Sequence, residues 1–537
     1  MPPSATAAPK LELASWVRPL SGCSRACTLL TRRAPAQLDA ASALPPDIRA
    51  AIAERPWRGG LEPCGDVDYE VEPSCIEGKL PASLCGTLYR CGPGRIRVGG
   101  RRYKHWFDGD GAMTAFTIDG ARGTVRVASR LVETPRVRAQ RAQGDDDAGF
   151  AARGAWTQAT AAWRNLAIPT NPSNTSALVW SDKLLAVCEG GAPVELDFDT
   201  LQTRGPAPFG RDPTLLGFGA HFKIDPLSNV LYNCGLQLPG ALRIFSINAE
   251  GKELASTSVS FGNGELAFVH DFAVTAGHLV FFIPPWVCQP LAMLQSVVGM
   301  RALGHAFSWQ ADRGTRCLVL RKRDFAVVLD TEVEAFSTYH FANAWEEAGL
   351  LKVYVNRLNG ERASLEERFS DMYSASFAHE HYNTLWEYCI DVDAGKVVRA
   401  APALPPSSGA LPMEYPVVSH RRTGLKNRFV YTTAFSGAGS SFFDALQKYD
   451  LQEGTTQTRA CPDGEYPSEV AFIPSDERDT AEDAGFILYV SYVAATHTSK
   501  LYVLDAADFE GAPLAVCHLR VHAPYSFHGW FEKAGKR

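Results

Sequence analysis

From about residue 80 onward, this chain of 537 residues is a succession of short strand-like segments. Runs rich in Val, Phe, Tyr and Leu recur between turns rich in Gly, Asn, Asp and Pro. Residues 184–203 predict two strands that flank the turn Gly190-Gly191, and residues 486–506 predict a long hairpin. Few segments have the periodicity of a helix, so strands and helices do not alternate as in parallel α/β folds. The sequence therefore predicts an all-β protein, either a sandwich array or a β-propeller.

Four histidines that lie far apart in the chain share one context, an apolar and aromatic segment: His221, His270, His340 and His528. They are separated by 49, 70 and 188 residues, so only a closed fold can bring all four to one point. Inner strands of a propeller converge on one axis, which favours the propeller. An unpaired buried imidazole is costly, and four neutral imidazoles suit Fe, Zn, Cu or Ni. We expect these side chains to form a metal site.

Carboxylates are expected behind such a site, because four neutral ligands leave the charge of a divalent ion uncompensated. Three glutamates stand in apolar surroundings: Glu189, Glu414 and Glu469. Each alone would be an ordinary residue at a strand end. Together they are predicted to accept the far ring N–H groups of the histidines. Four imidazoles would saturate a tetrahedral zinc ion, whereas six-coordinate iron would keep positions open for dioxygen or water.

A second histidine pair is a weaker candidate. In a strand, His379 and His381 would point to the same face, as two metal ligands require. No third ligand stands near them in the sequence, so an ordinary structural role is the simpler interpretation.

Net charge and cysteine content limit the classes of partner and compartment. The formal net charge is −6. Because a nucleic-acid partner requires a basic surface, this charge argues against nucleic-acid binding. The 13 cysteines are scattered and odd in number, without paired zinc-ligand spacing. They indicate reduced thiols in an intracellular or plastid protein.

Residues 1–45 differ from the remainder, 46–537, which we expect to be a single domain. The N-terminal segment is basic, rich in Ala, Ser and Thr, and lacks the apolar stretch of a secretory signal. This composition is typical of an organelle transit peptide. A disordered tail is the alternative.

Segment 284–304 is strongly apolar, but it is too short and too interrupted to span a bilayer. Basic residues accompany and follow it: Arg301, Arg313, Arg316, Arg321, Lys322 and Arg323. An apolar stretch with cationic flanks is typical of a monotopic membrane anchor. The alternative is a helix that packs in the core.

Specific motifs occur in HWFDGDGAMTAF (105–116) and FVHDFAVT (268–275), and FHGW (527–530) follows near the C-terminus. Weaker matches lie between and before them, in order: GTLYRCGPGR (86–95), LLAVCEGGAP (184–193), GAHFKIDP (219–226), YHFANAWEE (339–347), MEYP (413–416) and YPSEVAFIP (466–474). With these segments the chain resembles the carotenoid cleavage oxygenases. That family includes plant and cyanobacterial carotenoid dioxygenases and the animal retinoid isomerase. One departure is Ala112, where the family commonly reads DGDGM, and we expect it to lengthen a turn.

The resemblance implies a fold and a set of site residues. The fold would be a seven-bladed β-propeller, with helical loops covering an apolar substrate tunnel. The iron ligands would be His221, His270, His340 and His528, and the glutamates behind them Glu189, Glu414 and Glu469. His221 would be the ligand without a glutamate partner. Segment 284–304 would lie where some members contact a membrane.

The resemblance also implies an activity. The chain would be a non-haem Fe(II)-dependent dioxygenase that uses O2 to cleave a C=C bond of a carotenoid or apocarotenoid into two carbonyl products. Carotenoids reside in plastids, and the basic N-terminus is typical of a transit peptide. The two together favour a plastid location for this protein, with the cytoplasm as the alternative. Other functions on the same scaffold are an isomerohydrolase of retinyl esters and a stilbene-cleaving oxygenase. A metal-free propeller that serves as a binding scaffold is the remaining alternative.

Overall fold

The computed structural model describes residues 46–142, 144, 154–166, 170–209, 217–359, 383–437, 439–475 and 481–535. The predicted transit segment 1–45 and the pair His379 and His381 lie outside these ranges. Short helices accompany the strands: α3 (Pro46–Glu54), α4 (Pro135–Arg141) and α5 (Pro290–Val297).

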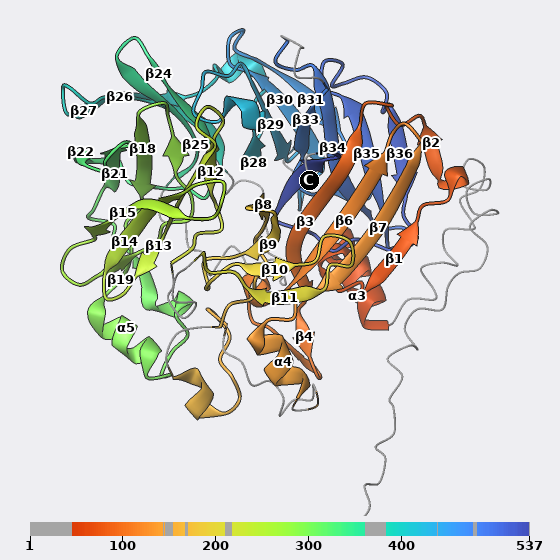
Figure 1. Ribbon diagram of the computed structural model, residues 1–537, viewed down its shortest axis with the longest axis horizontal. Helices are drawn as coiled ribbons and strands as arrows, with labels where there is room; N and C mark the ends of the chain where they lie inside the picture. The colour runs from red at the N-terminus through yellow and green to blue at the C-terminus, as the bar shows by residue number, and fades with distance from the viewer. Residues whose placement is uncertain are drawn as a thin grey trace, which may run out of the picture.

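Seven antiparallel sheets of four or more strands make up most of the described chain and are arranged in a ring (Figure 1). The first three, in hydrogen-bonding order, are β1 (Val67–Glu70), β7 (Thr124–Leu131), β6 (Asp110–Asp119), β3 (Cys85–Arg95) and β37 (His528–Lys533); β11 (Thr203–Pro206), β10 (Val194–Leu196), β9 (Lys183–Val187) and β8 (Ser176–Trp180); and β12 (Lys223–Asp225), β13 (Val230–Gln237), β14 (Ala241–Ile247) and β15 (Glu253–Ser260).

The other four sheets follow in the same way. They are β17 (Ala273–Val274), β18 (His278–Ile283), β21 (Thr315–Arg321) and β22 (Val327–Val333); β23 (Phe336–Ser337) and β24 (Phe341–Glu347) on β25 (Leu350–Asn359), then β26 (Thr384–Asp391) and β27 (Lys396–Pro402); β28 (Met413–Val417), β29 (Phe429–Ala434), β30 (Ala445–Asp450) and β31 (Thr455–Ala460); and β32 (Glu465–Pro467) and β33 (Ala471–Pro474) on β34 (Gly485–Val493), then β35 (Thr498–Asp505), β36 (Ala515–His518) and β2 (Ile76–Gly78).

Apolar clusters between neighbouring sheets close the ring. Each of seven buried clusters takes side chains from two successive sheets, and the series returns to the sheet where it began. The last junction, for example, packs Leu88 and Phe116 of the first sheet against Leu488 and Val503 of the last one. This closed circuit is the seven-bladed propeller that the resemblance implied. The two predicted hairpins, β9–β10 and β34–β35, form within it.

Strands from both ends of the chain complete the first and last blades. The final strand, β37, pairs with β3 of the first blade, from Gly86↔Lys533 to Cys91↔His528. In the other direction, β2 from the N-terminal part joins β36 of the last blade. The ring is therefore closed by hydrogen bonds as well as by apolar packing.

The departure at Ala112 does not lengthen a turn, in contrast to our expectation. Ala112 lies inside β6, where it pairs with Gly92 of β3 and Leu131 of β7. A Cβ atom at Gly94 would lie 2.2 Å from the Ala112 side chain, so glycine at position 94 makes room for the methyl group. The extra residue is accommodated by strand pairing.

Segment 284–304 lies at the edge of the molecule, beside the three-stranded sheet β16 (Leu266–Ala267), β19 (Trp286–Cys288) and β20 (Phe307–Trp309) (Figure 1). In and after α5, apolar side chains face outward, with Leu291 68%, Leu294 57% and Met300 73% exposed. The helix therefore packs against the protein through Ala292 and Met293 and leaves its outer face exposed. None of the described helices has the length and apolar character needed to cross a membrane.

Candidate metal centre

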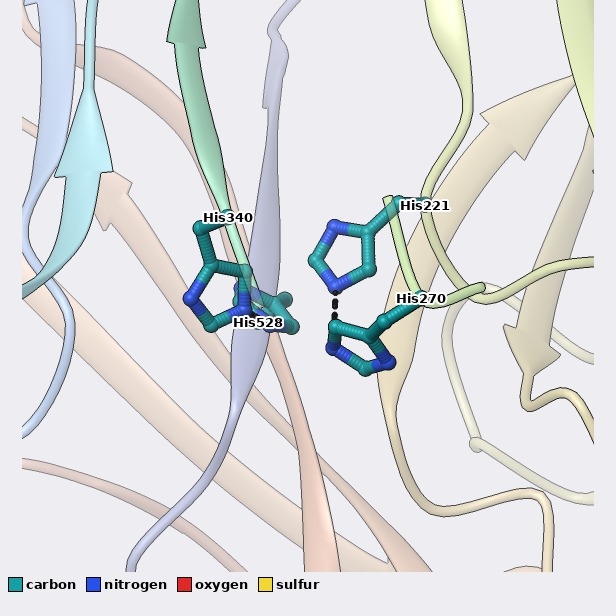
Figure 2. Close-up of side chains that lie close together, drawn as sticks. All are labelled: His221, His270, His340 and His528. Atoms are coloured by element: carbon teal, nitrogen blue, oxygen red, sulfur yellow. Dashed lines mark hydrogen bonds between the residues drawn. The ribbon is translucent and has the colours of Figure 1, made fainter. Parts of the chain in front are cut away.

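The four predicted histidines meet at one point (Figure 2). His221 lies just before β12, His270 between β16 and β17, and His340 between β23 and β24, while His528 is the first residue of β37. Only His528 is in a strand, so the strand-like character of the other three segments belongs to their neighbours. Each histidine comes from a different blade, at or before an inner strand. The ring therefore brings together side chains that no local structure could join.

The distances between ring nitrogens are short. The four candidate ligand atoms all lie within 4.8 Å of one another. The Nε2 atoms of His221 and His270 are 3.0 Å apart, and those of His340 and His528 are 3.2 Å apart. His340 and His528 are both buried, and His221 is half-buried.

The three predicted glutamates lie behind three of the four imidazoles. The Nδ1 atom of His270 is 2.7 Å from Glu189 Oε1. The Nδ1 atoms of His340 and His528 are 2.6 Å from Glu414 Oε2 and 2.7 Å from Glu469 Oε1.

The fourth imidazole differs from these three. Among the described residues, no carboxylate contacts His221.

The carboxylates determine which ring nitrogen faces the centre. Glu414 and Glu469 accept the Nδ1–H of His340 and His528, so Nε2 of each of these two rings carries a lone pair. In His340 and His528, two such lone pairs face each other at 3.2 Å. Two acceptors at this distance repel each other unless a cation lies between them. The donor set therefore fits a metal ion bound through Nε2 atoms.

The spacing of the nitrogens adds a constraint. Two ligands bound at about 2.1 Å are about 3.0 Å apart if they meet at right angles and about 3.4 Å apart in a tetrahedron. The observed 3.0 Å matches the right-angle spacing, and 3.2 Å lies midway between the two spacings.

The electrostatics keep Glu189 and Glu469 charged and His221 neutral. Burial raises the pKa of Glu189, but His270, a backbone N–H and His528 together lower it overall. The pKa of Glu469 is also lowered: burial opposes this, while His528 and Arg90 cause it. Burial and the neighbouring imidazoles hold the pKa of His221 well below its ordinary value. A neutral imidazole is the form that binds a metal.

Two of the glutamates hold polar partners that the sequence did not reveal. Glu469 Oε2 is 2.6 Å from the buried guanidinium of Arg90 and accepts the backbone N–H of Gly529 at 3.0 Å. Glu414 accepts hydrogen bonds from the side-chain amides of Asn356 and Asn383. The only signal for Arg90 was its position in the segment 86–95 that carries the resemblance.

An apolar cavity of about 240 Å³ adjoins the cluster, and His270, His340 and His528 line part of it. Its lining includes Leu303, from segment 284–304, and Phe307. Much of the rest of the lining is aromatic: Trp106, Phe442, Phe443, Tyr525 and Phe527. Such a cavity suits an extended apolar molecule.

Tyr415 has a strained backbone at the wall of this cavity. Its φ is +56°, which costs a non-glycine residue on the order of 1–3 kcal/mol, and the following Pro416 restricts it further. The bend interrupts the pairing of β28 with β29 between Glu414 and Val417. It also turns the Tyr415 N–H toward Glu414 Oε2, at 3.0 Å. Strain at this place is typical of a functional site.

Residues 63–533 match the family described as retinal pigment epithelial membrane protein. The apocarotenoid-15,15'-oxygenase of Synechocystis is 31% identical over 86% of this chain and 93% of its own length. The isoeugenol monooxygenase of Pseudomonas nitroreducens is 26% identical over 84% of this chain and 93% of its own. Among solved structures, cobalt-substituted Synechocystis ACO superimposes with a TM-score of 0.77 at 29% identity, covering 90% of this chain and 99% of that one.

Proposed function

Because the chain belongs to the retinal pigment epithelial membrane protein family of carotenoid cleavage oxygenases, we propose that it cleaves a C=C bond of a carotenoid or apocarotenoid, using Fe(II) and dioxygen. It is a dioxygenase. The observation that carries the proposal is the convergence of four imidazoles, three with carboxylates behind them, at the wall of an apolar cavity.

Iron is the proposed metal, held by His221, His270, His340 and His528. The all-imidazole donor set also suits zinc, but four imidazoles would saturate a tetrahedral zinc ion. Six-coordinate iron would keep positions open beside the four imidazoles. When bound, ferrous iron would supply the activation of dioxygen.

The chain's own residues bind the substrate and set the metal ligands. Glu189, Glu414 and Glu469 hold the imidazole rings in one tautomer and orientation. The apolar and aromatic wall excludes water and binds a polyene by burial, which is non-directional. The position of the cleaved bond would therefore depend on how far the polyene enters the cavity. The imidazoles donate and accept no proton in this scheme.

Metal analysis combined with product analysis tests the proposal. We expect about one iron per chain in the wild-type protein, and two carbonyl products from a carotenoid or an apocarotenoid. His340→Ala should lose the iron and the activity, while His278→Ala, which changes an imidazole paired with Glu346 outside the cluster, should keep both. Stoichiometric iron in His340→Ala would contradict the ligand assignment.

Two other reactions on this scaffold remain candidates for the test. The similarity to the isoeugenol monooxygenase supports a smaller phenolic alkene, and a stilbene would belong to the same class. A panel of β-carotene, an apocarotenal, a stilbene, isoeugenol and a retinyl ester separates these from each other and from an isomerohydrolase. Cleavage of the phenolic alkenes alone would replace the carotenoid in the proposal.

Membrane contact through segment 284–304 is part of the proposal, because exposed Leu291, Leu294 and Met300 form an apolar face. Carotenoids reside in membranes of the plastid, so we also propose import through residues 1–45. A fusion of residues 1–45 to a fluorescent protein should enter plastids. Cytoplasmic fluorescence would favour the alternative location.

A further inference from the structure

We propose that the hydroxyl group of Tyr415 binds an oxygen atom of the substrate beside the four histidines, and so selects an oxygenated polyene over a hydrocarbon. The inference rests on the proposed function and names the substrate class within it. It assigns Tyr415 a specificity role that is separate from holding the metal.

The position of Tyr415 is determined by its neighbours. Its ring centroid lies 5.5 Å from that of His340 and 5.4 Å from that of His528, so the phenol packs beside two of the metal-site imidazoles. Phe443 contacts it edge-on at 5.9 Å. The left-handed backbone at Tyr415 and the hydrogen bond from its N–H to Glu414 hold the ring in this place.

The hydroxyl group has no hydrogen-bond partner among the described residues. Tyr415 is half-buried and lines the cavity, while Tyr69, Tyr354 and Tyr502 use their hydroxyl groups in hydrogen bonds within the protein. A phenol is protonated at neutral pH and donates a hydrogen bond through its O–H.

A polar contact at this point would fix the position of the polyene along the cavity. Successive C=C bonds of a polyene are nearly alike, and apolar burial does not distinguish one from the next. A hydrogen bond to a carbonyl or hydroxyl oxygen fixes one atom of the substrate relative to the imidazoles. Buried sites that bind a substrate oxygen also discriminate against analogues that lack it.

Anaerobic binding tests this proposal without turnover. The ligands are an all-trans apocarotenal, the alcohol obtained from it by reduction, and β-carotene as the hydrocarbon. A hydrogen bond to the conjugated carbonyl shifts the absorption maximum of the aldehyde to longer wavelength. We expect this shift in the wild-type complex and its loss in Tyr415→Phe, which removes one oxygen atom and keeps the ring.

Affinities should follow the same pattern. Tyr415→Phe should weaken apocarotenal binding about 5–10-fold, the size of one hydrogen bond, and leave β-carotene binding unchanged. If Tyr415→Phe also binds the alcohol more weakly, the phenol donates its hydrogen bond to a hydroxyl oxygen as well as to a carbonyl oxygen. Tyr69→Phe is the matched control, because this phenol does not line the cavity and its hydroxyl group accepts a hydrogen bond from the Arg520 N–H. The control should bind all three ligands as the wild type does.

Several results would overturn the proposal. The first is an equal affinity of Tyr415→Phe and wild type for the apocarotenal. The second is an absorption maximum of the wild-type complex that equals that of the free aldehyde in an apolar solvent. This measurement uses the wild type alone and does not depend on the folding of a variant. Failure of the proposed function would look different, because the wild type would then neither bind nor cleave any polyene. If only the role of Tyr415 is wrong, the wild type still cleaves a polyene.

Discussion

At the scale of single residues, the three carboxylates behind the imidazoles differ in what else they hold. Glu189 Oε1 lies 2.7 Å from His270 Nδ1, and Glu189 Oε2 accepts from the Cys188 thiol, whereas Glu469 pairs with His528 and also neutralises buried Arg90. The same substitution should therefore have different consequences at the two positions.

We expect Glu189→Gln to weaken iron binding about 10–100-fold and to change the free energy of unfolding little. Glu469→Gln should weaken iron binding similarly and also lower the free energy of unfolding by about 1–3 kcal/mol, because Arg90 loses its charged partner. Metal titration and urea unfolding measure the two effects. Glu346→Gln, which alters a histidine–glutamate pair outside the cluster, is the control. Equal stabilities of the two site variants would contradict the assignment.

The depressed pKa of His221 predicts a dependence of stability on pH in the metal-free protein. Unfolded, this imidazole titrates near pH 6.5, so below that pH the unfolded chain binds a proton that the folded chain does not. The free energy of unfolding should therefore fall as the pH is lowered from 7 to 5, by about 2 kcal/mol in total from this residue.

His221→Gln should remove this part of the slope, as measured by urea unfolding at pH 7, 6 and 5. His270, whose pKa is raised, contributes with the opposite sign. His278→Gln serves as the control outside the cluster. Identical slopes in His221→Gln and wild type would be incompatible with a neutral, buried His221.

At the scale of elements, the segment around α5 is apolar but not basic. The cations expected to flank it are mostly paired: Arg313 with Glu265, Arg316 with Asp330, Arg321 and Arg323 with Asp324, and Lys322 with Asp225. Membrane binding should therefore depend on apolar contact and respond little to salt or anionic lipid.

The double substitution Leu291→Asp and Leu294→Asp should weaken liposome binding at least about 100-fold, because two exposed leucines lose their burial in lipid. Cleavage of a detergent-dispersed substrate should persist. Sedimentation with phosphatidylcholine liposomes, with and without anionic lipid, measures the effect. Leu227→Asp is the control, since Leu227 is 73% exposed away from α5. Unchanged binding of the double variant would exclude this face as the contact.

At the scale of the whole molecule, the C-terminal strand has two functions. β37 provides His528 at its first residue and completes the first blade through its pairing with β3. Removal of the last ten residues should therefore remove a proposed ligand and also open the ring.

We expect deletion of residues 528–537 to abolish cooperative thermal unfolding, as measured by circular dichroism. His528→Ala should unfold cooperatively but lose its iron, because the strand remains. Deletion of residues 534–537 should leave both properties intact, since β37 ends at Lys533. A cooperatively folded 528–537 deletion would show that the apolar junctions close the ring without this strand.

The sequence by itself determined the kinds of element and the candidate donors. Short β-rich runs between turns predicted the strands, as in β34 and β35, because side-chain alternation and turn residues act locally. Unusual polar residues in apolar segments indicated the histidines and glutamates, because such groups are costly to bury without a partner.

Only the tertiary structure decided how these residues meet. Arg90 reaches Glu469 across 379 positions of sequence, and Tyr415 takes a left-handed backbone that presents its ring to His340 and His528. Neither follows from local pattern, because both depend on blades brought together by closure of the ring. The outward face of α5 was equally undecided, since an apolar helix has the same sequence signal whether the fold covers it or leaves it exposed.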